Sequence, residues 1–225
     1  MTEPALRIEN LTLGYRDHVA VDDLSLVVER GEFVHIAGRN GSGKSSLAKA
    51  ALGLIPIWSG TVALGVAKDR IGYLAQGEGQ DPSFPATVFE VALAGRQNLG
   101  KIFPFYSKAD RDAAWRALDE VGIADLSGRR VGELSGGQRR RALIARALAR
   151  DPEFLILDEP LSGLDRESES GLMRLLDRFN RERGLTVMMT THDLGLAGPE
   201  ARVVALDGRI LYDGPAAGRE DRRHG

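Results

Sequence analysis

The first third of the chain carries hydrophobic residues at the spacing of β-strands. Apolar and polar residues alternate between residues 24 and 28, and they alternate less regularly over residues 6–13. Residues 33–37 form a continuous apolar run, which is typical of a buried strand. A glycine-rich turn follows, and residues 44–54 then predict a helix. The pattern here predicts strands over residues 6–13, 24–28, 33–37, 61–64 and 71–74.

The middle of the chain, from residue 77 to about residue 130, has a different pattern. It contains several glycines and prolines, and its apolar residues recur at the spacing of one helix face. Residues 88–95 and 109–121 indicate two helices, and a third is expected over about residues 135–150. The change from strand spacing to helix spacing predicts a helical subdomain over residues 77–150.

The last third alternates between short apolar runs and amphipathic segments. It predicts strands over residues 154–157, 186–191, 203–206 and 210–212, with a helix over residues 167–182. Asp207-Gly208 is a strong signal for a hairpin turn between the last two strands. Strand-helix-strand order is typical of a parallel sheet with helices packed on it. Within a single domain we expect a core from residues 1–76 and 151–217, and a flexible tail over 218–225.

Composition excludes several classes of protein. The 225 residues are 43% hydrophobic and 28% charged, as in ordinary soluble globular chains. The absence of cysteine excludes disulfides, thiolate metal sites and cysteine nucleophiles. A formal net charge of −2 is too balanced for a general nucleic-acid binder. Because the sequence shows neither a membrane-length apolar run nor a signal-peptide pattern, we expect a cytosolic chain that leaves membrane work to another chain.

A glycine-rich stretch with the spacing G-x-x-x-x-G-K-[ST] separates the strand over residues 33–37 from the helix that follows. Backbone N–H groups in such a loop wrap around phosphate oxygens, and the helix N-terminus adds partial positive charge. Lys44 would bring a full positive charge to the β- and γ-phosphates, and the Ser45 hydroxyl would bind Mg²⁺. The expected nucleotide contacts are Gly38, Arg39, Asn40, Gly41, Ser42, Gly43, Lys44, Ser45 and Ser46.

Two adjacent carboxylates follow the apolar residues 154–157. Ligands bind at the carboxyl ends of strands in a parallel sheet, so Asp158 and Glu159 are expected at the mouth of the sheet. Asp158 would hold Mg²⁺ through water, as in other phosphate-loop enzymes. Glu159 would orient or deprotonate a water molecule, which makes it the candidate general base.

A second candidate anion site lies in Leu134-Ser135-Gly136-Gly137-Gln138. Ser135 is a suitable N-cap for the helix that follows, and a capped helix end with free N–H groups attracts anions. The phosphate loop already accounts for the phosphates of one nucleotide. We therefore expect this second site to face a nucleotide bound to another subunit.

Together these motifs resemble the ATPase subunit of an ATP-binding-cassette (ABC) transporter, over about residues 5–215. The resemblance implies that Tyr15 stacks on adenine and that Gln76 links the Mg²⁺ site to the helical subdomain. It also implies that Asp165 contacts the opposite subunit and that His192 contacts the γ-phosphate. The expected catalytic residues are then Glu159, His192, Gln76 and Lys44, and the expected Mg²⁺ ligands are Ser45, Gln76 and Asp158.

The resemblance also implies an α/β fold, with a phosphate-loop NTPase core containing a mixed sheet, an N-terminal antiparallel β-subdomain and an inserted helical subdomain. Two chains would close head-to-tail around two ATP molecules, so that Lys44 and Ser45 of one chain face Ser135 and Gly137 of the other. The implied cofactors are ATP and Mg²⁺. The implied partners are a second ATPase subunit, integral membrane permease subunits at the inner face of the cell membrane and, indirectly, a substrate-binding protein.

Residues 72–76, 84–88 and 91–96 narrow the resemblance to the ATPases of zinc/manganese-type metal-ion importers. Siderophore and cobalamin importers share part of this pattern, and they stay open as an alternative. A soluble ABC ATPase outside transport and an exporter ATPase stay open as well. A non-hydrolysing module is disfavoured because Glu159 and His192 are both present. The aromatic residues Phe84, Phe89, Phe103, Phe105 and Tyr106 are expected to leave an apolar docking patch.

Several residues are open to a simpler interpretation. Taken singly, Tyr15, Gln76 and His192 are typical of packing or solvated positions, and only their order around the two strong motifs favours function. The arginines at 139–141 predict a solvated helix face, or otherwise a partner contact. We interpret the remaining histidines, His18, His35 and His224, as structural or solvated, and Trp58 and Trp115 as packing residues.

Overall fold

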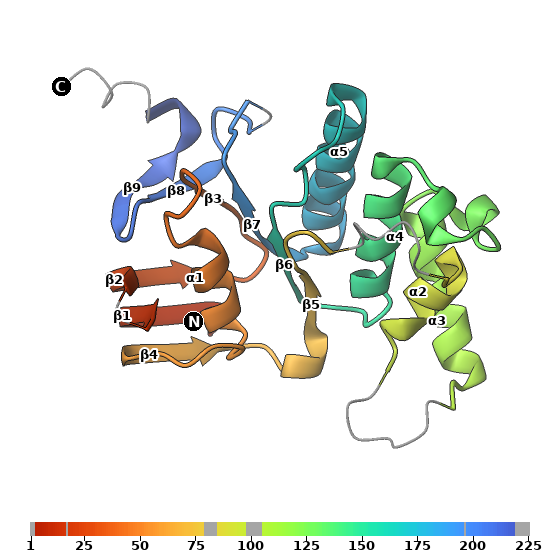
Figure 1. The fold of residues 1–225 in the computed structure, drawn as a ribbon, viewed down its shortest axis with the longest axis horizontal. Coiled ribbons are helices and arrows are strands. Elements are labelled where there is room, and N and C mark those ends of the chain that lie inside the picture. The colour runs from red at the N-terminus through yellow and green to blue at the C-terminus, as the bar shows by residue number, and fades with distance from the viewer. Residues whose placement is uncertain (1–2, 17, 79–84, 98–104, 196, 219–225) are drawn as a thin grey trace.

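The computed structural model describes residues 3–16, 18–78, 85–97, 105–195 and 197–218. Its larger sheet has six strands in the order β5-β6-β7-β3-β8-β9 (Figure 1). Strands β5 to β8 run parallel to their neighbours and β9 runs antiparallel to β8, so the sheet is mixed, as expected. These strands are β3 (Phe33–Ala37), β5 (Ile71–Leu74), β6 (Phe154–Asp158), β7 (Thr186–Thr191), β8 (Arg202–Leu206) and β9 (Ile210–Pro215).

A second, three-stranded sheet is antiparallel and has the order β2-β1-β4. It is formed by β1 (Leu6–Tyr15), β2 (His18–Val28) and β4 (Ser59–Leu64), and it confirms the expected N-terminal β-subdomain. Helix α1 (Lys44–Ala51) contacts strands of both sheets. One buried hydrophobic cluster joins its side chains to both, because apolar residues such as Leu47 and Ala48 are fully buried.

The other helices lie on the β5 side of the large sheet (Figure 1). They are α2 (Val88–Ala94), α3 (Lys108–Glu120), α4 (Gly136–Leu148) and α5 (Arg166–Arg183), with short 3-10 turns η1 (Lys68–Arg70), η2 (Ala124–Leu126) and η3 (Val131–Glu133). Thr87, Ser107, Ser135 and Asp165 cap the N-termini of α2 to α5 with their side chains. Each cap satisfies an amide that the helix itself leaves without a partner. None of the helices in the described part of the chain is long and apolar enough to span a lipid bilayer.

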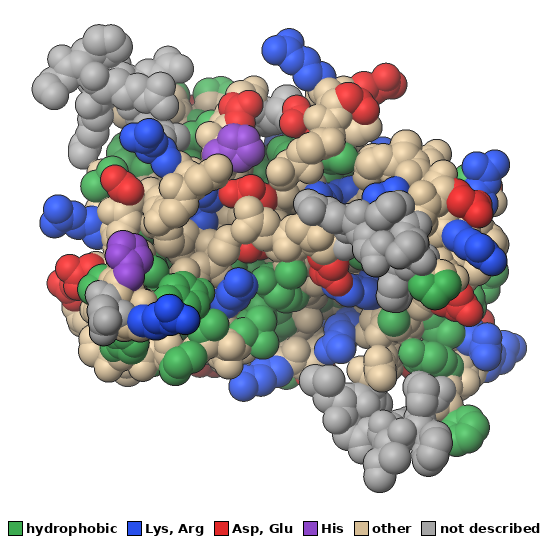
Figure 2. Space-filling model, viewed as in Figure 1, with side chains coloured by type: hydrophobic (Ala, Val, Ile, Leu, Met, Phe, Trp, Pro, Cys, Tyr) green, Lys and Arg blue, Asp and Glu red, His purple; other side chains and the backbone are tan. Residues whose placement is uncertain are grey.

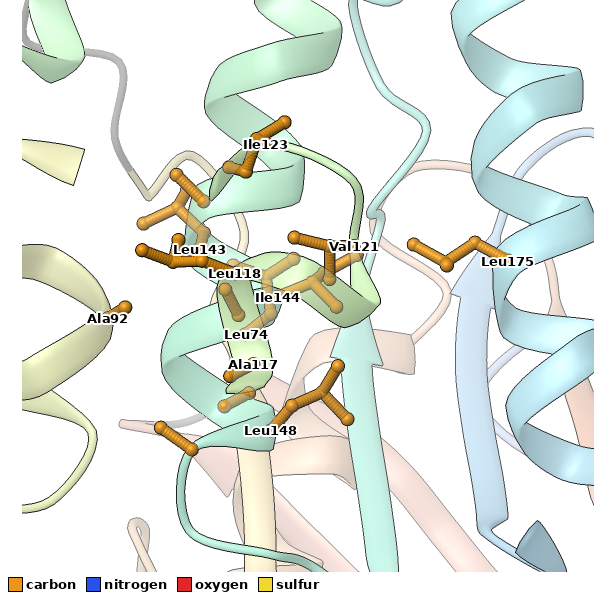
Figure 3. Close-up of a cluster of buried hydrophobic side chains, with 14 of the residues drawn as sticks. Leu74, Ala92, Ala117, Leu118, Val121, Ile123, Leu143, Ile144, Leu148 and Leu175 are labelled. Carbon is orange, nitrogen blue, oxygen red and sulfur yellow. The ribbon is translucent and has the colours of Figure 1, made fainter. Parts of the chain in front are cut away.

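A second hydrophobic cluster joins α2, α3, α4 and α5 to the large sheet. Figure 3 shows Leu74 of β5 among Leu118, Ile144 and Leu148 from α3 and α4. Leu175 of α5 belongs to the same buried cluster. Because this cluster runs without a break from the helices onto strands β5, β6 and β7, the orientation of α4 is coupled by packing to the edge of the sheet.

Most of the expected elements are present, with small differences at their ends. Helix α1 ends at Ala51, earlier than expected, and the residues that follow form a turn. The expected hairpin is present, and Gly208 has the positive φ of 69° that such a turn requires. Of the expected tail, residues 219–225 lie outside the described residues. The division of the chain into a core and a helical subdomain stays a prediction.

The structure places two further groups of side chains, the histidines and the aromatic residues outside the site. His35 is buried against Phe33, whereas His224 lies outside the described residues. Trp115 packs on Phe89 with ring centroids 5.0 Å apart, but Trp58 and Trp115 each remain about half exposed. Of the aromatic residues expected in a docking patch, Phe84 and Phe103 lie outside the described residues, Phe105 is exposed, and Phe89 and Tyr106 pack partly against the core.

Candidate nucleotide-binding site

The phosphate loop joins the carboxyl end of β3 to the N-terminus of α1. Gly43 has a φ of 96°, and a Cβ atom placed there would lie 2.5 Å from the carbonyl oxygen of Ala20. Only glycine fits this position, because the backbone is left-handed and a neighbouring strand is in contact. The first turn of α1 has neither a side-chain cap nor an acidic residue, so its amides are available to an anion.

Lys44 is held over this loop by contacts within the chain. Its side chain is only 4% exposed, and its Nζ donates to the carbonyl oxygens of Gly38 and Arg39, both at 2.9 Å. The same Nζ lies 3.6 Å from Oε1 of Glu159. A full positive charge is therefore fixed beside the N-terminus of α1, with the candidate base next to it.

Three oxygen-bearing side chains from separate elements meet at the edge of the sheet. The hydroxyl oxygen of Ser45 lies 3.0 Å from Asp158 Oδ1 and 3.3 Å from Gln76 Oε1. Asp158 is fully buried, and within the described residues its Oδ2 has no hydrogen-bond partner. A hydroxyl, an amide oxygen and a buried carboxylate oxygen with free lone pairs fit Mg²⁺, which prefers oxygen ligands and binds few protein groups. The expected Mg²⁺ ligands are thus brought together.

Thr190 contacts both acidic residues, Asp158 through its carboxylate and Glu159 through its backbone, although no prediction from the sequence included it. Its hydroxyl donates to Asp158 Oδ1 at 2.7 Å and accepts from the backbone N–H of Glu159 at 2.8 Å. Glu159 has a φ of 49°, which is uncommon for a residue other than glycine and needs support from its surroundings. The available signal was a pair of threonines, Thr190 and Thr191, that ends an otherwise apolar strand.

Two clefts meet at Glu159. One, of about 290 Å³, is lined by Tyr15, the phosphate loop, Gln76 and Glu159. The other is lined by Glu159 and His192, and His192 also borders the outer side of the phosphate loop. His192 is solvent-exposed, so it is placed at the mouth of the site and not in its floor.

The aromatic residue expected at the base of the nucleotide lies in the first of these clefts. Tyr15 is 48% exposed, and its hydroxyl oxygen lies 3.3 Å from that of Ser46. His18 pairs with Tyr15 across the β1-β2 hairpin and lines the same cleft. His18, which we interpret as structural or solvated, is thus exposed and lies in the cleft that also contains Tyr15. Figure 2 shows mixed acidic and basic side chains across the view of the molecule in which α1 faces the reader.

The second expected anion site has a different geometry. Ser135 accepts from the Gln138 backbone N–H at 3.3 Å, and Gln138 Oε1 accepts from the Ser135 N–H at 3.1 Å. Gly136 lines a cleft beside residues 162–164 that Lys44 does not line. Asp165 caps α5, and its hydrogen bonds from Ser168 lower the pKa of its carboxyl. Within one chain, the structure does not bring Ser135 or Asp165 to the phosphate loop.

Comparison with known proteins shows the family. A family model described as ABC transporter matches residues 21–162. The manganese transport system ATP-binding protein MntB of Listeria innocua is 36% identical over 216 residues, which cover 93% of this chain and 90% of that protein. The zinc uptake system ATP-binding protein ZurA of the same organism is 36% identical, covering 94% of this chain and 86% of that protein.

This chain belongs to the ABC transporter family. It is similar in structure to a putative metal-chelate type ABC transporter in an inward-facing conformation, with a TM-score of 0.86, 29% identity and coverage of 96% of this chain and 85% of that one. It is also similar to a dimeric ATP-binding cassette in a post-hydrolysis state bound to ADP and Pi, with a TM-score of 0.77, 28% identity and coverage of 93% and 98%. It is an ABC ATPase subunit, which binds and hydrolyses ATP.

Residues 134–138 are called the signature segment below. The arginines at 139–141 that follow it do not form a solvated face, so that prediction is wrong. Arg140 is only 7% exposed, and its Nη2 donates to the carbonyl oxygen of Ser162 at 3.3 Å. Arg139 donates to the backbone carbonyls of Val131, Gly132 and Leu134. Arg141 donates to that of Val121 at 2.7 Å. The sequence pattern failed because an arginine stem packs well on apolar surface while its head group satisfies loop carbonyls.

The loop after Gln76 is anchored to α4 in this ABC ATPase. Glu78 forms an ion pair with Arg146, and one of its oxygens accepts from the Ala75 N–H at 3.3 Å. Arg146 also donates to the carbonyl oxygen of Tyr73 at 3.2 Å. Burial, and then the negative charges of Asp158 and Glu78, raise the pKa of Tyr73 to about 12, so its hydroxyl stays protonated beside the site.

Proposed function

We propose that this chain binds MgATP in the cleft between Tyr15 and the phosphate loop and hydrolyses it with Glu159 as the general base. The observation that carries this proposal is the meeting of Ser45, Gln76 and Asp158 within hydrogen-bond distance, with an Asp158 oxygen that no described residue satisfies. Beside them stands a lysine–carboxylate pair in which both side chains are buried.

Each residue has a defined task in this proposal. The first-turn amides of α1 and the Lys44 ammonium bind the β- and γ-phosphates. Ser45, Gln76 and Asp158 hold Mg²⁺, which supplies electrostatic stabilisation of phosphate charge when it is bound. Glu159 accepts a proton from the attacking water while the water oxygen bonds to the γ-phosphorus and the bond between this phosphorus and ADP breaks, which leaves ADP and inorganic phosphate.

The remaining expected contacts complete the site. Tyr15 stacks on the adenine base. Residues 38–43 and Ser46 surround the phosphates and the part of the cleft next to the adenine. His192, at the mouth of the site, donates to the γ-phosphate. These roles agree with the placement of each side chain around the two clefts that meet at Glu159.

A second copy of the chain completes the assembly in our proposal. Ser135, Gly136, Gly137 and Gln138 at the start of α4 contact the nucleotide of the partner copy, and Asp165 contacts the partner chain. Support comes from the separation of this helix end from Lys44 within one chain. Further support comes from the dimeric ATP-binding cassette with ADP and Pi to which this chain is similar.

The transported substrate in our proposal is zinc or manganese, moved by permease subunits in the cell membrane. The supporting observation is that two relatives of 36% identity are ATP-binding proteins of a manganese transport system and of a zinc uptake system. The chain would then work on the cytoplasmic face of the membrane, with a substrate-binding protein as an indirect partner. In this proposal those other subunits contact the transported metal; the described part of the chain has no group of three or more His, Cys, Asp or Glu arranged for a metal ion.

Uptake measurements test this proposal directly. The gene would be deleted, and uptake of zinc, manganese and iron would be measured in parallel under chelation. We expect a defect confined to zinc or manganese, which wild type restores and Glu159→Gln does not. If only siderophore-iron uptake were lost, the proposed substrate would be an iron chelate and not a metal ion. Normal uptake of all three would contradict the proposed cargo and leave only the ATPase activity.

A further inference from the structure

Two arginines of α4 reach the two loops that border the proposed catalytic centre. Arg146 Nη2 lies 2.8 Å from Glu78 Oε2, and Glu78 in turn holds the loop that contains Gln76. Arg140 Nη2 donates to the carbonyl oxygen of Ser162, in the turn that follows Glu159. One helix therefore holds both loops through charged side chains.

The burial of Arg140 carries a desolvation cost, because its side chain is charged. Its side chain is 7% exposed, and its Nη1 has no hydrogen-bond partner in the described part of the chain. Burial lowers the pKa of the guanidinium, and the nearby carboxylate of Glu78 acts in the opposite direction. Apolar side chains of similar volume commonly replace a buried charge without loss of stability. A charge kept here with one carbonyl contact therefore points to a role other than stabilising the fold.

The contact with Ser162 leads directly to Glu159. The backbone N–H of Ser162 donates to the carbonyl oxygen of Glu159 at 3.2 Å, which closes a tight turn. Glu159 begins this turn with its positive φ, and its carboxylate lies 3.6 Å from Lys44 Nζ. Since Thr190 fixes the other side of the Glu159 backbone, the turn has support at both ends.

We propose that Arg140 is a positioning residue for ATP hydrolysis, which ties the signature helix α4 to the turn that carries Glu159. This inference rests on the general-base role proposed for Glu159. A change in the orientation of α4 then reaches Glu159 through Arg140, and it reaches Gln76 through Arg146 and Glu78. Glu159 and Gln76, the groups proposed to position the water, are thus both connected to α4. The rate of hydrolysis therefore depends on the orientation of this helix.

Substitution of Arg140 tests the inference in the full-length chain. Arg140→Met removes the charge and the donor but keeps an unbranched side chain, so we expect the protein to fold. Single-turnover hydrolysis should fall by about 10-fold or more, the ratio expected for loss of a charged hydrogen bond, with the affinity for MgATP unchanged. Arg140→Lys keeps a charged donor and should recover part of the rate. Arg141→Gln is the matched control, because Arg141 also donates to a loop carbonyl, that of Val121. This variant should hydrolyse ATP at the wild-type rate.

A double-mutant cycle with Glu159→Gln separates positioning from a general effect on structure. If Arg140 acts through Glu159, Arg140→Met causes little further loss once Glu159 is replaced. Losses that multiply in the double variant, or full activity in Arg140→Met, would overturn the inference alone. Full activity in Glu159→Gln would overturn the proposed base and the inference together, so the two failures are distinguishable. Thermal unfolding of each variant confirms that the compared proteins are folded.

Discussion

The N-termini of α1 and α4 are both suited to bind anions, yet they are prepared in opposite ways. At α1, no side chain caps the first turn, and a buried lysine stands beside it. At α4, Ser135 and Gln138 form a complete capping box, and the nearby arginines donate to carbonyls of their own chain. Lys44 also donates to carbonyls of its own chain, so the difference lies in the amides: those at the start of α1 have no side-chain cap, whereas α4 supplies its own cap.

This difference explains why one site is complete in a single chain and the other is not. The α1 site gathers Lys44, Ser45, Gln76, Asp158 and Glu159 from several elements around one cleft. The α4 end lines a separate cleft beside residues 162–164, where Arg139 and Arg140 also lie and donate to carbonyls of their own chain. In the proposed dimer, α4 therefore adds contacts to a nucleotide that the partner has already bound.

The largest expected effect tests the chemistry at the α1 end. Glu159→Gln should bind ATP but lose about 10²- to 10⁴-fold in turnover, because it removes the general base. ATP hydrolysis and equilibrium nucleotide binding measure the two parts, and the variant should accumulate as a closed dimer with ATP. Glu167→Gln, on the exposed first turn of α5, serves as the control and should turn over normally. Normal turnover in Glu159→Gln would show that another group activates the water.

A paired substitution compares the two helix ends directly. Lys44→Ala should lower the ATP affinity of the monomer by about 10- to 100-fold, because it removes charge-assisted hydrogen bonds to phosphate. Ser135→Ala should leave the ATP affinity of the monomer unchanged and weaken the ATP-dependent dimer. Calorimetry on dilute protein and sedimentation with ATP measure the two quantities. Equal loss of monomer affinity in both variants would contradict the proposed division of labour.

His35 in β3, the strand that leads into the phosphate loop, should make the unfolding free energy depend on pH, whereas α4 contains no histidine. Burial lowers the pKa of His35 from 6.5 to about 4, so below pH 6.5 the unfolded chain binds a proton that the folded chain does not. The neutral imidazole therefore makes its full contribution to the unfolding free energy above pH 6.5. This contribution falls as the pH drops towards 4, and at pH 5 it is lower by about 2 kcal/mol.

Urea unfolding at several pH values measures this contribution. In His35→Gln the difference in unfolding free energy between pH 7 and pH 5 should be smaller than in wild type by that amount. His18→Gln, at an exposed position, is the control for the replacement of a histidine by glutamine. Parallel curves for wild type and His35→Gln would mean that His35 titrates in the folded chain as it does when unfolded.

The smallest expected effect concerns the cap of α4. Ser135→Ala removes the side-chain acceptor for the Gln138 amide and should cost about 1 kcal/mol of unfolding free energy. Ser135→Asn keeps a capping acceptor and should restore most of the stability. If Ser135→Ala were as stable as wild type, the cap would not support α4, and the contrast with the uncapped α1 would lose its energetic basis.

Much of the fold and the site follows from patterns within short segments. The strand over residues 33–37, the phosphate loop and the two carboxylates after residue 157 are each readable from consecutive residues. Local motifs are predictable because neighbouring residues in the chain supply both the backbone geometry and the chemistry. The same holds for the capping box at Ser135, where the partners are three residues apart.

Other parts of the site depend on pairs that are far apart in the sequence. Thr190 and Asp158 are separated by 32 positions, and Arg146 and Glu78 by 68. A pattern search could not pair them, because threonine and arginine are common and their partners are set by how the strands and α4 pack. The arginines at 139–141 were interpreted as solvated for this reason.

The sequence by itself determined which residues carry the chemistry, because glycine-rich loops, strand-end carboxylates and helix caps are written in consecutive positions. Tertiary structure decided which of these residues meet in one chain. The order β5-β6-β7-β3 brings Gln76, Asp158, Thr190 and the phosphate loop to one edge of a parallel sheet, where the carboxyl ends of strands converge. The same packing keeps the signature end of α4 apart from the phosphate loop and buries Arg140 against the turn after Glu159.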